Sequence, residues 1–229
     1  MSYIIGSNRP WCNGISKRLN EEFKETFHLI KTEKELNIQT IQVIKPKIIF
    51  LPFWSYLIPE TIFKEYNCII FHMTDLPYGR GGSPLQNLII KGNKDTMISA
   101  VKCIKEIDAG PVYLKKPMSL SGTAEEIYLR TGKIIENMIV EILRTKVKPE
   151  PQVGDIVQFL RRKPKDGNWT NVKSLDEVYD YIRMLDADGY PHAFIYNGKY
   201  KLEFKRPVRS EESVLADVKI TMYDESGLH

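Results

Sequence analysis

Through the first 150 residues, short apolar runs alternate with segments whose apolar residues recur every three or four positions. This alternation is typical of an α/β sheet in which helices connect neighbouring strands. Thr123 and Glu126 form a capping-box pattern at the start of the longest helical segment. The predicted strands are 3–6, 27–30, 47–51, 67–72, 96–105 and 110–120, and the predicted helices are 15–27, 33–45, one starting at 58, 85–90 and 123–143.

The pattern changes after residue 146. A stretch rich in Pro and Gly, 146–154, predicts a linker. Beyond it, Asn197-Gly198 is a two-residue hairpin signal, and Ser174 with Glu177 caps a single predicted helix at 174–187. The predicted strands of this part are 156–161, 192–196, 200–204 and 214–222. We therefore expect an α/β domain at residues 1–148 and a small β-rich domain at residues 149–229.

Composition removes several classes of protein. With 42% hydrophobic and 27% charged residues, the 229-residue chain has enough apolar material for a core, which excludes disorder. The longest apolar run, 48–54, is far below the ~20 residues of a membrane span. Cys12, Cys68 and Cys103 are odd in number and scattered, which excludes a disulfide scaffold. A cytoplasmic protein with no membrane partner is expected.

Charge is divided unevenly along the chain. Residues 1–150 hold 21 Lys and Arg against 16 Asp and Glu, whereas residues 151–229 hold 12 against 13. Affinity for a polyanion comes largely from Lys and Arg, so this balance predicts no nucleic-acid partner. A small anionic ligand suits the first part of the chain, and an ordinary mixed surface is the alternative.

Familiar cofactor and metal motifs are absent from the sequence. No G-x-G-x-x-G follows the first predicted strand, and no His or Cys pair has metal-ligand spacing, so no metal is expected. His72 remains as a candidate, because it ends a buried strand and precedes a glycine-rich loop. Ligands of open α/β sheets bind at the carboxyl ends of strands. Asp108 begins a second polar turn, and either residue could instead be structural.

Three segments together resemble a known family. His72–Pro84 is similar to the H-P-S-L-L-P-x-x-R-G-x-x-P loop of 10-formyltetrahydrofolate-dependent formyltransferases. Asp108–Val112 resembles their D-x-G-P-I turn, 36 residues downstream, and Pro52–Pro59 resembles their pterin-binding stretch. The resemblance covers about residues 1–145. It implies a Rossmann-like formyltransferase core, with 10-formyltetrahydrofolate as co-substrate and no metal.

The resemblance also implies roles for individual residues. His72 would polarise the formyl oxygen or handle the proton of the attacking amine, and Asp108 would orient and charge its imidazole. The family has an Asn two positions before this His, where the present chain has Ile70. Asn67, Thr74 and Asn87 are the nearby polar candidates to replace it. The donor would lie between two walls, formed by Trp54, Ser55, Tyr56 and Leu57 and by Ile104, Glu106, Ile107 and Asp108.

The resemblance leaves the acceptor amine open. Segments 161–168 and 182–191 resemble the C-terminal parts of sugar N-formyltransferases. Together with the charge balance, they favour a UDP- or dTDP-linked 4-amino-4,6-dideoxy sugar, used in surface-glycan or nonulosonic-acid synthesis. Methionyl-tRNA formylation and a non-catalytic folate-binding module are the alternatives. Only small-molecule partners are expected, and a homodimer is left open. The candidate acceptor contacts are Arg9, Trp11, Tyr78, Arg80, Gly82 and Tyr190, each of which could instead belong to the surface or core.

Overall fold

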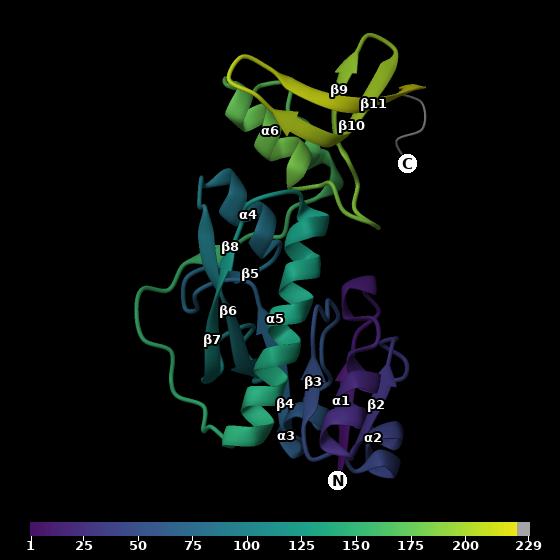
Figure 1. Ribbon diagram of the computed structural model, residues 1–229, viewed down its shortest axis with the longest axis vertical. Coiled ribbons are helices and arrows are strands. Elements are labelled where there is room, and N and C mark those ends of the chain that lie inside the picture. Colours follow the sequence, from purple (N-terminus) through teal and green to yellow (C-terminus); the bar gives the residue numbers. More distant parts are fainter. Residues whose placement is uncertain (224–229) are drawn as a thin grey trace. The chain divides into compact units, whose positions relative to one another are not determined.

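The computed structural model describes residues 1–223, which form two compact units (Figure 1). The first unit comprises residues 1–84, 96–118 and 128–159, and the second comprises the remaining described residues. The two units interleave along the chain, and each is described by itself. A division into domains at residues 148 and 149 stays a prediction.

The first unit is built on a six-stranded sheet of order β2-β1-β3-β4-β6-β7. Strands β1 to β4 run parallel, whereas β6 pairs antiparallel with β4. The strands are β1 (Ser2–Gly6), β2 (Thr26–Ile30), β3 (Ile49–Leu51), β4 (Cys68–His72), β6 (Asp95–Lys102) and β7 (Val112–Ser119). This arrangement confirms the expected Rossmann-like α/β fold.

Helices α1 (Ile15–Phe23), α2 (Ile38–Ile44), α3 (Glu60–Glu65), α4 (Pro84–Ile90) and α5 (Ala124–Thr145) connect or follow the strands. Two are shorter than predicted. Helix α1 ends before Lys24, which adopts a left-handed φ of 54°. Helix α2 begins only after Asn37, whose side chain accepts the N–H of Thr40 at 2.9 Å. Caps, rather than apolar periodicity, therefore set these boundaries.

The core of the first unit explains why the apolar runs are strands. A cluster of buried residues joins strands β1 to β4 to helices α2 and α3. Its members are Ile4, Ile30, Leu36, Ile41, Ile49, Leu51, Ile62 and Cys68. Because parallel strands are buried on both faces, their sequences are continuously apolar rather than alternating.

The second unit contains a three-stranded antiparallel sheet of order β11-β10-β9. Its strands are β9 (Ala193–Asn197), β10 (Tyr200–Arg209) and β11 (Val214–Met222), and α6 (Leu175–Arg183) packs on β10. The Ser174 hydroxyl caps α6 by accepting the N–H of Glu177 at 3.1 Å. This is the small β-rich part expected from the sequence, although β10 extends five residues further than predicted.

The predicted strand at 156–161 is reduced to two residues. Strand β8 (Gln158–Phe159) pairs in parallel with β5 (Arg80–Gly81) inside the first unit. The chain beyond the predicted linker therefore returns to the loop that follows His72. In the described part of the chain, no helix is long and apolar enough to cross a membrane.

Candidate active site

His72 is the last residue of β4, at the carboxyl end of the strand, and its side chain is buried. Ile70 is two residues earlier and so lies on the same face of the sheet. The Ile70 side chain packs against the apolar cluster of the first unit. The position of the family's Asn is therefore apolar in this protein, as the sequence indicated.

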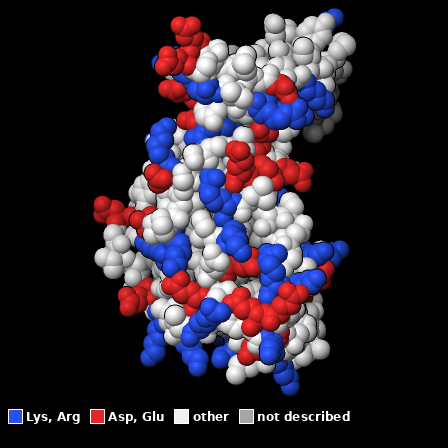
Figure 2. Space-filling view, in the orientation of Figure 1, with Lys and Arg blue, Asp and Glu red and all other residues white. Residues whose placement is uncertain are grey.

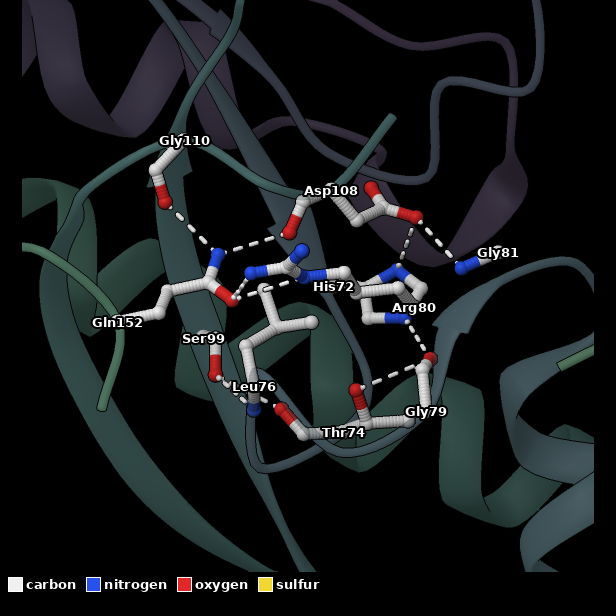
Figure 3. Close-up of polar contacts among 10 residues, drawn as sticks. All are labelled: His72, Thr74, Leu76, Gly79, Arg80, Gly81, Ser99, Asp108, Gly110 and Gln152. Carbon is white, nitrogen blue, oxygen red and sulfur yellow. Dashed lines mark hydrogen bonds and ion pairs between the residues drawn. The ribbon is translucent and has the colours of Figure 1, made fainter. Parts of the chain in front are cut away.

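Both ring nitrogens of His72 face acceptors (Figure 3). Nε2 lies 2.8 Å from the carbonyl oxygen of Gly79, and Nδ1 lies 3.5 Å from Oδ2 of Asp108. A carbonyl only accepts, so Nε2 carries a proton here. The imidazole ring is therefore held between the Gly79 carbonyl on one side and the Asp108 carboxylate on the other.

Asp108 is held in place by a constrained turn. It adopts a left-handed φ of 53°, and its Oδ2 accepts the N–H of Gly81 at 3.0 Å. Gly110, two residues later, has no space for a side chain, because an added Cβ would lie 1.8 Å from the backbone oxygen of Lys102. The D-x-G pattern thus reflects backbone packing as well as chemistry.

Gln152 supports the same turn and was not anticipated from the sequence. Its amide nitrogen donates to the carbonyl oxygens of Asp108 and Gly110, each at 2.8 Å. Its Oε1 accepts from the Arg80 guanidinium at 3.1 Å and 2.8 Å. Gln152 lies in the stretch predicted to be only a linker, and no motif marks it, so only its contacts identify it.

The loop after His72 is fixed by a hydroxyl on the neighbouring strand. Ser99 on β6 lies opposite His72 and is fully buried. Its hydroxyl donates to the carbonyl of Thr74 at 2.7 Å and accepts the N–H of Leu76 at 3.4 Å. The Thr74 hydroxyl donates to Gly79, the same carbonyl that His72 contacts, at 3.4 Å. These bonds order the loop around His72.

Of the three polar residues considered as replacements for the family's Asn, only Thr74 lies beside His72. Asn67 accepts a hydrogen bond from the Tyr113 hydroxyl at 2.9 Å. Asn87 lies in the second unit and donates to Leu160. Asp75, the loop carboxylate, forms an ion pair with Lys115 at the surface instead of facing His72.

The two predicted donor walls both belong to the first unit, and whether they enclose one folate pocket stays a prediction. Trp54 and Cys103 both pack against the apolar cluster, and the Trp54 indole N–H is buried with no hydrogen-bond partner among the described residues. A cavity of about 540 Å³ is lined by Ile104, Glu106 and helix α3. Tyr56, Leu57 and Ile107 are exposed, and Ser55 lies between Trp54 and Tyr56.

Cys103 also lines this cavity. Burial, and then the nearby charge of Asp108, raise the pKa of its thiol to about 11. Burial likewise raises the pKa of Cys68 to about 12 and that of Cys12 to about 11. None of the three thiols is therefore a nucleophile at neutral pH.

The residues predicted to contact the formyl-accepting substrate lie in different parts of the structure. Tyr78, Arg80 and Gly82 lie in the loop after His72, with Tyr78 edge-on to Phe159 and the Gly82 N–H bonded to its carbonyl at 3.0 Å. Trp11 is buried and stacks on Tyr128 at 4.2 Å.

Arg9 and Tyr190 were also predicted to contact the formyl-accepting substrate. The Arg9 guanidinium lies over the Trp11 ring at 5.6 Å. Tyr190 belongs to the second unit, where it lines a cavity of about 670 Å³. No group of three or more His, Cys, Asp or Glu among residues 1–223 is arranged to hold a metal ion.

A His–Asp pair thus lies at the carboxyl end of a strand in a Rossmann-like sheet, which is where the ligands of such sheets bind. Residues 7–143, more than half of the chain, match the family described as formyl transferase. Residues 164–221 match the family described as methionyl-tRNA formyltransferase, C-terminal domain. The chain belongs to the formyl transferase family. The family's formyl donor is 10-formyltetrahydrofolate, as expected.

Individual relatives refine this assignment. A solved methionyl-tRNA formyltransferase from Clostridium thermocellum is 44% identical, with a TM-score of 0.94, and the match covers 97% of this chain and 99% of that one. A curated methionyl-tRNA formyltransferase from Malacoplasma penetrans is 27% identical over 76% of this chain. The present chain spans only 58% of that relative's length. A sugar N-formyltransferase from Shewanella has a TM-score of 0.71 at 14% identity, which indicates a shared fold alone.

These findings overturn two expectations. The nucleotide-sugar acceptor, with its role in glycan synthesis, is wrong, because the 44% identical structure and the C-terminal family match both carry the name methionyl-tRNA formyltransferase. The expectation of small-molecule partners without nucleic acid is wrong for the same reason. The short C-terminal part had seemed to argue against a methionyl-tRNA acceptor. The match covers 99% of the Clostridium thermocellum chain, so a protein with that name can have a C-terminal part of this length.

Proposed function

We propose that this chain transfers a formyl group from 10-formyltetrahydrofolate to the α-amino group of methionyl-tRNA. The observation that carries the proposal is the 44% identity to the Clostridium thermocellum methionyl-tRNA formyltransferase across 97% of the chain. The His72–Asp108 pair supports it independently, because this pair supplies the chemistry that such a transfer requires.

In the reaction, the amine nitrogen attacks the formyl carbon and forms a tetrahedral oxyanion. Collapse of this intermediate breaks the bond to N10 of the folate. The amine loses a proton and N10 gains one, which leaves a formamide and tetrahydrofolate. A His72 imidazolium can stabilise the oxyanion by donating a proton or hydrogen bond, and the Asp108 carboxylate favours the cationic ring.

His72 requires one rearrangement before it can act in this way. Its Nε2–H is occupied by the carbonyl of Gly79 at 2.8 Å. Binding of the formyl group would replace this carbonyl as the acceptor, while Nδ1 stays paired with Asp108. Thr74 is the hydroxyl nearest to this exchange, because it donates to the same Gly79 oxygen. Thr74 is therefore our candidate for the donor that takes the place of the family's Asn.

For the folate, we propose the two segments Trp54–Leu57 and Ile104–Asp108 as binding walls. The buried indole N–H of Trp54, which has no hydrogen-bond partner among residues 1–223, supports this, since such a donor is normally satisfied by a ligand or water. The cavity beside Ile104 and Glu106 gives the second wall an adjoining space of suitable size.

We propose a tRNA-binding surface on the second unit, which the net charge of residues 151–229 did not indicate. Four of the five residues from Arg161 to Lys165 are basic, and Arg161, Lys163 and Lys165 are exposed. Acidic residues elsewhere in the unit cancel these charges in the sum. Figure 2 shows basic and acidic side chains side by side on the face in view. Several carboxylates of the unit already pair with other basic residues, such as Asp176 with Arg209 and Asp217 with Arg206. A phosphate backbone is bound by local clusters, so the distribution matters more than the total.

The proposal is tested by offering the protein both acceptors with 10-formyltetrahydrofolate. Methionyl-tRNA should be formylated, and a panel of UDP- and dTDP-linked 4-amino sugars should not. Uncharged tRNA serves as the control, because it lacks the amine. Folate binding without transfer to any acceptor would support the non-catalytic alternative, which the Ile70 departure motivates.

A further inference from the structure

Strand β11 forms an open edge of the sheet in the second unit. It pairs with β10 on one side and has no strand on its other side among the described residues. Its apolar side chains are strongly exposed, with exposed fractions of 45% at Val218, 62% at Ile220 and 73% at Met222. Open edges with apolar side chains are templates for pairing with another strand.

The sequence of β11 alternates in a way that separates its two faces. Every second residue is apolar, and these side chains share one face: Val214, Ala216, Val218, Ile220 and Met222. The opposite face carries Leu215, Asp217, Lys219 and Thr221, with Asp217 and Lys219 on either side of Val218. Asp217 also forms an ion pair with Arg206 of the neighbouring strand β10. Lys219 has no ion-pair partner within 4.0 Å in residues 1–223.

The backbone amide groups in the middle of β11 face the open edge of the sheet. The N–H of Tyr223 donates to the carbonyl of Lys199 at 2.7 Å, toward β10. Amide groups of successive residues in an antiparallel strand point to opposite sides, so those of Val218, Ile220 and Met222 point away from β10. Val218 therefore presents its N–H and C=O to an incoming strand.

We propose that two copies of this chain associate by antiparallel pairing of their β11 strands about a two-fold axis at Val218. In this register each Asp217 lies opposite Lys219 of the second copy, and each Val214 lies opposite Met222 of the second copy. Two three-stranded sheets become one six-stranded sheet. Opposite charges directly across a strand pair are stabilising, and the apolar faces become continuous.

The neighbouring registers are disfavoured. An axis at Asp217 or Lys219 would place each of these residues opposite its own copy, with like charges in contact. It would also centre the pairing on residues whose amides point toward β10. Axes at Ala216 or Ile220 also have outward-pointing amides, but they would place Asp217 opposite Leu215 or Lys219 opposite Thr221 and so form no opposite-charge pair. The axis at Val218 is the one that pairs Asp217 with Lys219, which is why we choose a second copy in this register.

A single strand pair is a small interface, at the low end of those that are stable. The association should therefore be reversible and visible between about 1 and 100 µM. Sedimentation velocity over this range should show the mass rising with concentration from 26.6 kDa toward twice that value. A constant 26.6 kDa mass throughout the range would overturn the proposal.

The register is tested by a charge exchange between two proteins. Asp217→Lys alone places Lys opposite Lys, and Lys219→Asp alone places Asp opposite Asp, so each variant should associate more than about tenfold more weakly than the wild type. Mixed together, the two variants restore an opposite pair at both positions. The mixture should form a heterodimer with near wild-type affinity, and failure to do so would refute the register.

A further substitution tests the interface in case the charge variants fail to fold. Val218→Lys places two ammonium groups at the axis and should keep the protein monomeric, with an unchanged circular dichroism spectrum. Val208→Lys is the matched control, because Val208 is 63% exposed on β10, outside the paired edge. Val208→Lys should associate like the wild type, and equal loss of association in both variants would contradict the proposed interface.

Discussion

Gln152 holds the main chain of Asp108: its amide nitrogen donates to the Asp108 carbonyl oxygen at 2.8 Å. The same side chain binds Arg80 through its oxygen, so one residue connects the Asp turn to the loop after His72. The left-handed φ of Asp108 persists only while its surroundings hold it, and Gln152 is part of those surroundings.

Gln152→Leu should therefore lower kcat for formyl transfer by about tenfold, because the Asp108 carboxylate loses its fixed position. The fold should remain, since the residue contacts only one turn and one loop. Steady-state kinetics with a thermal melt separate these effects. Gln158→Leu, at an exposed position of β8, is the matched control and should retain wild-type kcat.

Gly110→Ala should destabilise the protein by more than about 3 kcal/mol, because the new methyl group meets the Lys102 backbone oxygen. Gly92→Ala is the comparison. Gly92 has a φ of 78° and no atom within 4 Å of an added Cβ, so only backbone strain of about 1–2 kcal/mol applies. Urea unfolding measures both values, and an equal cost in the two variants would contradict the close approach at Gly110.

The ion pair between Arg18 and Glu136 should make the free energy of unfolding depend on pH. The Arg18 guanidinium donates to both carboxylate oxygens at 2.7 and 2.8 Å and lowers the pKa of Glu136 from its ordinary 4.5. The ionised pair therefore stabilises the fold above that pH, and this contribution is lost as the pH falls through the folded-state pKa. Glu136→Gln should be less stable than the wild type at pH 7, and the difference should shrink as the pH falls below 4.5 and through the lowered pKa of Glu136. Glu21→Gln, at an exposed position, should show no such dependence.

The basic run of the second unit gives a prediction for tRNA. The double variant Arg161→Glu, Lys163→Glu should raise the KM for methionyl-tRNA and reduce the salt dependence of binding, because fewer phosphates are neutralised. The KM for 10-formyltetrahydrofolate should not change. Lys17→Glu reverses an equally exposed charge on α1 and serves as the control. An unchanged KM for methionyl-tRNA in the double variant would show that this run is not part of the tRNA surface.

Much of the fold could be predicted because apolar runs mark buried parallel strands directly. Strand β4 ending at His72, the Thr123 cap of α5 and the Asn197-Gly198 hairpin are each specified by a few adjacent residues. Helix ends were harder, since a left-handed residue such as Lys24 leaves no mark in the apolar pattern.

The candidate site was predictable only where it has a local motif. His72 and Asp108 stand in recognisable segments, whereas Gln152 and Ser99 act through contacts that only the folded chain creates. The acceptor was predicted wrongly because a net charge sums over a whole segment and does not show where basic residues are concentrated. The run Arg161–Lys165 was visible in the sequence, and it is the local cluster that we propose for tRNA.

The central claim, that His72 and Asp108 carry out formyl transfer to methionyl-tRNA, is tested most directly by single-turnover kinetics of His72→Ala. With methionyl-tRNA and 10-formyltetrahydrofolate both saturating, the transfer rate should fall about 10²–10⁴-fold while the affinity for each substrate stays near the wild-type value. Asp108→Asn should show a comparable loss, and combining the two substitutions should add little, since paired residues act as a unit. A folded His72→Ala protein that formylates methionyl-tRNA at the wild-type rate would contradict the account.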